Sequence, residues 1–133
     1  MDFLMYENSP FLITKIDEEC QLYFKDAPSL YRTKQVQSMN DIPFSLSYFY
    51  VSKRLPPIAN EGFLSFLSKQ YGTKKIDVHT NAIIITNDKV IEKQLSVQPH
   101  SPILLIRKVY QVKSTIIAFE RTYVNTKLKE YEI

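Results

Sequence analysis

The chain has 133 residues, the length of one domain, and a domain of this size buries roughly two-thirds of the surface that its unfolded form exposes. Hydrophobic residues make up 44% and charged residues 23%, so the composition argues against intrinsic disorder and predicts a single folded domain over residues 1–133. The formal charge of +3 comes from basic residues scattered singly or in pairs, which argues against a duplex-binding domain with a concentrated positive face.

Cysteine and histidine are too scarce for several kinds of site. Cys20 is the only cysteine, which excludes an internal disulfide, and with only His79 and His100 beside it a structural zinc site is not expected. No apolar stretch approaches the ~20 residues that span a membrane, and the first residues lack the basic start of a secretory signal. We therefore expect a cytoplasmic protein, and no motif implies a cofactor or a metal.

The first predicted helix covers residues 9–20. Pro10 follows two candidate capping residues and fits the first helical position, and Leu12, Ile16 and Cys20 recur at i, i+4 and i+8. A third, shorter helix is expected to start at residue 86 or 87 and to carry its apolar side chains inward at residues 91 and 95.

The second predicted helix begins after Asn60 and is the best defined. Asn60 can cap it, Glu61 complements its positive end, and Gly72 stops it. Its apolar stripe consists of Phe63, Leu64, Leu67 and Tyr71.

Most of the remaining chain is rich in β-branched and aromatic residues, which predicts strands. Short polar turns at residues 38–41 and 113–115 predict two antiparallel hairpins. The predicted strands are Leu30–Gln37, Phe44–Val51, Ile76–Thr86, Ile103–Val112 and Ile116–Val124.

An internal duplication relates the two halves of the chain. Setting Ala27-Pro-Ser-Leu beside Ser101-Pro-Ile-Leu aligns a proline and a leucine before each hairpin at an offset of 74 residues (102 − 28). Each half then runs strand, helix, strand, strand, with Phe3–Tyr6 as the first strand. The duplication predicts an α+β fold with one six-stranded antiparallel sheet and helices packed on it; the alternative is a chance likeness of two hairpins.

An ordered series of segments resembles the UTRA domain, the effector-binding domain of one branch of the GntR-family transcription regulators. The segments are Gly62–Gly72, Val90–Val97 and Pro102–Tyr110, and the resemblance covers nearly the whole chain. It implies a chorismate-lyase-like fold, a pocket between sheet and helices, homodimerisation, and binding of a small anionic metabolite such as a phosphorylated sugar or a carboxylate. DNA contact would be made only by a winged helix-turn-helix domain outside this chain.

The resemblance also implies site residues. Two basic residues on a strand of the first half hold the anion in the family, and they fall on Arg32 and Lys34, which share a face of the strand because side chains alternate. The family's Ser-Leu-Tyr helix start reads Gly62-Phe63-Leu64, where backbone N–H groups can still bind an anion. The remaining expected contacts are Ser47, at the family's acidic position, and Glu120, on the same face as Ala118.

Three functions fit these residues. The first is the sensing and dimerising domain of a transcription regulator. The second is a dimerisation module whose pocket has degenerated, because several family ligand positions are replaced. The third is a chorismate-lyase-like enzyme, but no nucleophile beside a base and no paired carboxylates support it, so no catalytic residue is expected.

Overall fold

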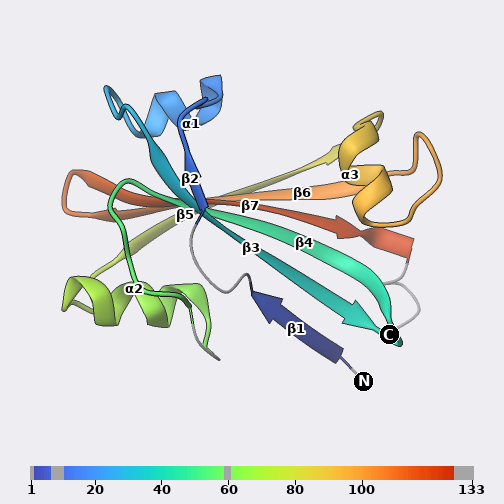
Figure 1. Ribbon diagram of the computed structural model, residues 1–133, viewed down its shortest axis with the longest axis horizontal. Coiled ribbons are helices and arrows are strands. Elements are labelled where there is room, and N and C mark those ends of the chain that lie inside the picture. The colour runs from blue at the N-terminus through green and yellow to red at the C-terminus, as the bar shows by residue number, and fades with distance from the viewer. Residues whose placement is uncertain (1, 7–10, 59–60, 128–133) are drawn as a thin grey trace.

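The computed structural model describes residues 2–6, 11–58 and 61–127, and in this part of the chain seven strands form one antiparallel sheet with three helices against it (Figure 1). The strands are β1 (Asp2–Tyr6), β2 (Phe11–Ile13), β3 (Leu30–Met39), β4 (Ile42–Val51), β5 (Asp77–Ile85), β6 (Ile103–Val112) and β7 (Thr115–Asn125). The helices are α1 (Glu18–Tyr23), α2 (Phe63–Tyr71) and α3 (Lys89–Gln94).

The sheet has the symmetry that the duplication predicts. Its strand order is β1-β3-β4-β7-β6-β5, so each half contributes three adjacent strands and the halves meet where β4 pairs with β7. Strands β3 and β6 begin 73 residues apart (103 − 30), and so do β4 and β7 (115 − 42). The six-stranded antiparallel arrangement is confirmed, with β2 as an unpredicted short strand that also pairs with β3.

The first helix is shorter than predicted and starts later. Asp17 caps α1 by accepting a hydrogen bond from the Cys20 N–H at 2.9 Å, and Phe11–Ile13 extend along β3 instead of coiling. The prediction of a helix over residues 9–20 is therefore wrong for residues 11–17, and residues 8–10, where its cap was placed, lie outside the described residues.

The other two helices agree better with the sequence, although α3 begins at Lys89 and not at residue 86 or 87, and Asn60, the predicted cap of α2, lies outside the described residues. Helix α2 ends at Gly72, whose φ of 62° is the left-handed conformation that glycine adopts at little cost, and α3 buries Ile91 and Leu95 as expected. Leu64 is wrong as a member of the apolar stripe: it is 45% exposed, and Phe66 is buried in its place. None of these helices is long and apolar enough to cross a membrane.

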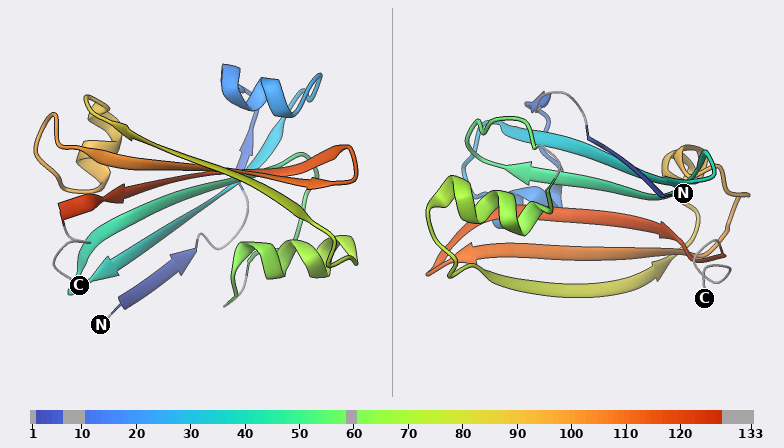
Figure 2. Two further views of the ribbon diagram at one scale, coloured as in Figure 1. Left: turned by 180° about the vertical axis from the view of Figure 1, so that it is seen from behind. Right: turned by 90° about the horizontal axis from the view of Figure 1, so that it is seen from below.

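The helices divide between the two faces of the sheet, with α1 and α3 on one side and α2 on the other, as Figure 1 and Figure 2 show. Phe63 of α2 packs on Phe49, whereas the neighbouring Tyr50 packs with Cys20 of α1. We call these the α2 face and the α1–α3 face. Both faces of the central strands are buried under helices, which gives the sheet a core on each side.

The tight turn between β3 and β4 depends on two polar residues. Asn40 and Asp41 have φ values of 51° and 64°, and positive φ at both central residues is the requirement of the hairpin turn that matches strand twist. Asn and Asp tolerate this conformation better than most residues, which explains why this short polar segment forms the turn.

Candidate functional site

The structure separates the predicted site residues onto different faces. In the register between β3 and β4, Arg32 lies opposite Tyr50 and Lys34 opposite Tyr48, so both basic residues belong to the α1–α3 face. Gln35 lies opposite Ser47, on the α2 face. The predicted combination of Arg32 and Lys34 with the Gly62 helix start is therefore wrong, because the sheet lies between them.

A cavity of about 290 Å³ lies on the α2 face at the start of α2. Side chains and backbone from β3, β4, α2, β6 and β7 converge on it, and it includes three of the predicted contacts. Its lining consists of Gln35, Phe49, Gly62, Phe63, Leu64, Ser65, Lys108, Tyr110 and Glu120.

Glu120 lies at one side of this cavity and is held by hydroxyl groups. Its carboxylate accepts hydrogen bonds from the Tyr110 hydroxyl at 2.6 Å and from the Thr122 hydroxyl at 2.8 Å. The Ser47 hydroxyl is hydrogen-bonded to Thr122 at 2.7 Å, so Ser47 supports Glu120 through Thr122. Glu120 is only 8% exposed, and one hydrogen bond to each carboxylate oxygen fixes its orientation.

The start of α2 offers backbone donors to the same cavity. Gly62 is the N-cap residue, with φ and ψ of −69° and 155°, and no side chain caps the helix there. Among the described residues, no atom lies within 4 Å of a Cβ added at Gly62. The first N–H groups of a helix carry partial positive charge and favour an anion.

Phe63 anchors this helix start to the sheet. Its ring packs on Phe49, with centroids 4.3 Å apart, and meets Tyr110 edge-on at 5.1 Å. Phe63 is therefore both a core residue and part of the cavity wall, and its contact with a ligand stays a prediction.

The cavity is also lined by Gln35, Lys108 and Tyr110, which were not predicted from the sequence. Lys108 and Tyr110 come from the second half of the chain, whereas the family pattern directed attention to basic residues of the first half. Strand alternation could have found them, because Lys108 lies opposite Glu120 in the register between β6 and β7. The pairing of those two strands was itself predicted from the turn at residues 113–115.

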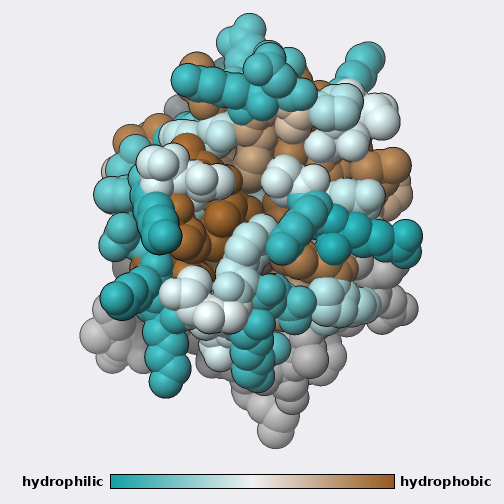
Figure 3. Space-filling view, turned by 90° about the vertical axis from the view of Figure 1, so that its left-hand side faces the viewer, coloured by the Kyte–Doolittle hydropathy of each residue, from teal (hydrophilic) through white to brown (hydrophobic). Residues whose placement is uncertain are grey.

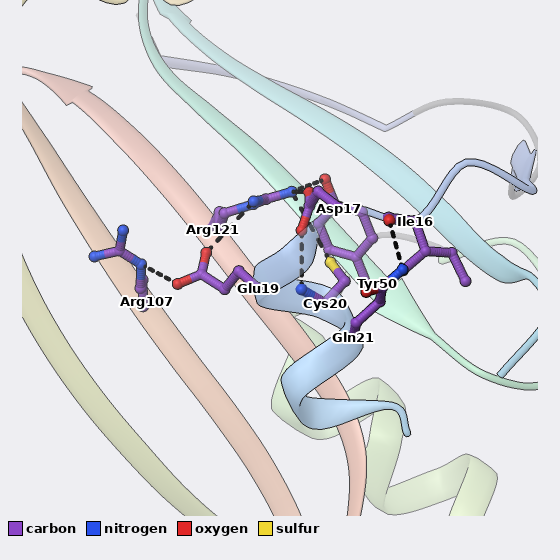
Figure 4. A network of polar contacts seen from close by, with 8 residues as sticks. All are labelled: Ile16, Asp17, Glu19, Cys20, Gln21, Tyr50, Arg107 and Arg121. Atoms are coloured by element: carbon purple, nitrogen blue, oxygen red, sulfur yellow. Dashed lines mark hydrogen bonds and ion pairs between the residues drawn. The ribbon is translucent and has the colours of Figure 1, made fainter. Parts of the chain in front are cut away.

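The α1–α3 face carries a separate ionic network, which Figure 4 shows around Arg121. The Arg121 guanidinium donates to Asp17 and to the Tyr50 hydroxyl, each at 2.6 Å, and lies 3.4 Å from Glu19. Glu19 also pairs with Arg107 at 2.6 Å. The network ties the first turn of α1 to β4, β6 and β7, and it gives Arg107 a structural role.

Charge and burial set the ionisation of the groups around Arg121. Burial opposes ionisation of Asp17, but the Cys20 N–H and the Arg121 guanidinium outweigh it and hold the pKa of the carboxyl below its ordinary value of 3.8. Burial raises the pKa of the Cys20 thiol to about 12, so this cysteine is protonated and unreactive at neutral pH.

The two basic residues first predicted to bind the ligand have other neighbours. The Arg32 guanidinium lies over the rings of Phe11 and Tyr48, at 5.5 and 5.1 Å from their centroids, and so takes part in cation–π contacts on the α1–α3 face. Within residues 2–6, 11–58 and 61–127, no group of three or more His, Cys, Asp or Glu side chains is arranged to hold a metal ion.

No protein-family model and no curated protein sequence matches the chain, but solved structures do. The C-terminal domain of the histidine utilization repressor from Pseudomonas syringae pv. tomato superposes with a TM-score of 0.74 at 13% identity, over 96% of this chain and 93% of that one. The ligand-binding domain of a GntR-family transcriptional regulator from Bordetella bronchiseptica gives 0.70 at 11% identity, over 92% and 84%. The chain has the fold of these domains.

The GntR-type ligand-binding fold confirms the expected α+β architecture of UTRA and chorismate-lyase-like domains. A longer regulator, YydK from Bacillus subtilis, matches 93% of this chain with a TM-score of 0.70 at 13% identity, but this chain covers only 58% of YydK. A fold of this type therefore also occurs as one part of a longer regulator chain.

Proposed function

We propose that this chain is the effector-binding and dimerisation domain of a GntR-family transcription regulator. It binds a small anionic metabolite, a phosphorylated sugar or a carboxylate, in the cavity at the start of α2. DNA is contacted by a winged helix-turn-helix domain outside this chain. The observation that carries the proposal is the convergence of polar groups from several elements on one cavity, in a fold that similar structures use for ligand binding.

The chemistry of the cavity suits an anion. Lys108 supplies a cation, Ser65 a hydroxyl in the first turn of α2, and the uncapped helix start supplies backbone N–H donors. Of the residues expected from the sequence, Gly62, Phe63 and Glu120 line the cavity and Ser47 supports it from behind. Arg32 and Lys34 have no place in this site.

Ligand binding is tested by thermal unfolding of the chain with a panel of phosphorylated sugars and carboxylates. A ligand present at about 100 times its dissociation constant stabilises the folded state by roughly 2.7 kcal/mol. The Lys108→Met variant should lose this stabilisation, and the exposed control Lys74→Met should keep it. The absence of stabilisation by every compound would instead support a dimerisation module with a degenerate pocket.

For dimerisation we propose the free edge of the sheet. Strand β5 is an edge strand, and Ile83 and Ile84 are 45% and 58% exposed on it. Two copies of such a strand can pair antiparallel about a two-fold axis and cover these side chains. Light scattering should show a dimer that the Ile84→Lys variant converts to monomer; a monomeric wild-type chain would contradict the proposal.

Ligand binding would act on transcription by changing how α2 sits on the sheet and hence how two protomers are placed. The test is operator release by a complete regulator that contains this domain: Lys108→Met should abolish the response to ligand and leave dimerisation intact. The enzymatic alternative is tested by incubation with chorismate, and pyruvate release at a useful rate would overturn the regulatory assignment.

A further inference from the structure

The cavity contains a buried carboxylate without a cationic partner. Both oxygens of Glu120 accept hydrogen bonds from neutral hydroxyl groups, and the side chain is 8% exposed. Within the described residues, every ion pair closer than 4.0 Å involves another carboxylate: Glu61, Asp17 or Glu19. Burying a carboxylate is costly unless an opposite charge compensates it, and none of the described residues supplies that charge to Glu120.

Lys108 lies beside Glu120 without pairing to it. The two are direct partners in the register between β6 and β7, both line the cavity, and their charged groups are more than 4.0 Å apart. The cavity therefore presents a cation and an anion that are not paired with each other.

The positive and negative ends of the site differ in their surroundings. On the positive side, Lys108 and the start of α2, whose first N–H groups carry partial positive charge, both line the cavity. On the negative side, Tyr110 and Thr122 fix the Glu120 carboxylate in place, so a ligand that pairs with it meets an acceptor that is already oriented. A charge-assisted hydrogen bond to such a group is about twice as strong as a neutral one.

We propose that the ligand carries a protonated nitrogen as well as an anionic group, with the nitrogen bound by Glu120 and the phosphate or carboxylate bound by Lys108 and the start of α2. This inference rests on the proposed ligand-binding function and narrows its ligand class. The cavity of about 290 Å³ has room for a small ligand of this kind.

The experiment compares pairs of probes in which a methyl group replaces the ammonium group. Phosphoethanolamine is matched with propyl phosphate, and 4-aminobutyrate with valerate, and each is titrated calorimetrically into the chain. We expect each amino compound to bind roughly tenfold or more tightly than its partner, because only the amino compound pairs with the buried carboxylate.

Two variants test whether Glu120 distinguishes the amino compounds from the methyl compounds and whether Lys108 binds the anionic end of each probe. Glu120→Gln keeps the size of the side chain and removes its charge, so it should bind both members of a pair equally. Lys108→Met should weaken all four probes, because it removes the cation that holds the anionic end. The controls Glu18→Gln and Lys74→Met change exposed side chains away from the cavity and should behave as the wild type.

The outcomes separate this inference from the broader function. Equal affinity of the wild-type chain for both members of each pair would overturn the ligand class and leave an anion-binding site. Discrimination that persists in Glu120→Gln would overturn the role of Glu120. If none of the four probes binds, the ligand class is wrong, and if the panel of phosphorylated sugars and carboxylates also fails, so is the cavity's binding function.

Discussion

Removal of Arg121 should destabilise the fold where α1 meets the sheet. The guanidinium is 15% exposed and reaches Asp17, Glu19 and the Tyr50 hydroxyl at once, so it is the main polar link between α1 and the strands beneath it (Figure 4). The Arg121→Met variant keeps an unbranched apolar stem of similar length and removes only the charged, hydrogen-bonding end.

The expected cost is about 3 kcal/mol of unfolding free energy. Hydrogen bonds to charged groups contribute roughly 1.5–3 kcal/mol each, and two of them are made at 2.6 Å. Asp17 is 47% exposed, so water can replace the guanidinium as its hydrogen-bond partner. The loss of this bond therefore contributes little to the cost of the substitution. The buried Tyr50 hydroxyl has no such compensation and accounts for most of the loss.

The cost is measured by urea unfolding followed by circular dichroism at neutral pH and again well below pH 3.8, the ordinary pKa of the Asp17 carboxyl. Because the folded state lowers this pKa, the pairing stabilises the fold above the ordinary value and is lost as pH falls through the lowered one. The difference between wild type and Arg121→Met should therefore shrink in acid. A cost below about 0.5 kcal/mol at neutral pH, the size typical of an ordinary surface substitution, would refute this account of the network.

Two further substitutions and one labelling experiment test the packing of the helices and the end of α2. Phe63→Ala should cost about 3–5 kcal/mol in urea unfolding, because it empties the contact between α2 and Phe49, and a cost below about 1 kcal/mol would contradict this anchoring role. Gly72→Ala should lower the free energy of unfolding by about 1 kcal/mol, because φ at this position is 62° and alanine adopts this conformation at a cost. Lys74→Ala, at an exposed site, serves as the control. Cys20 should react with a disulfide reagent only after unfolding, since it is fully buried and its pKa is raised to about 12; fast labelling of the folded chain would show that α1 opens readily.

The strands could be predicted well because local signals agreed with the global fold. Alternation, β-branched residues and short polar turns defined both hairpins, and the duplication supplied the order of the halves. The face on which α2 lies could not be predicted in the same way. The central strands are buried on both faces, as at Phe49 and Tyr50, so their hydrophobic pattern does not distinguish one side from the other.

The errors in the site and in the first helix have specific causes. Arg32 and Lys34 do share a face, as predicted, but the position of that face relative to α2 depends on packing between distant segments. The helix start was placed too early because Leu12, Ile16 and Cys20 have helical spacing by coincidence. The stronger cap is Asp17, and three residues of β2 are too few to show a period of two.

The duplicated sheet also shows where the two halves have diverged. At the offset of 73 residues, Gln35 and Ser47 of the first half correspond to Lys108 and Glu120 of the second, and each pair lies directly opposite in its hairpin. The corresponding pair of positions is thus neutral in one half and oppositely charged in the other, beside the same cavity. Exchanging the two pairs would retain the total charge and reverse its placement, so specificity in such a domain can change without any change in its scaffold.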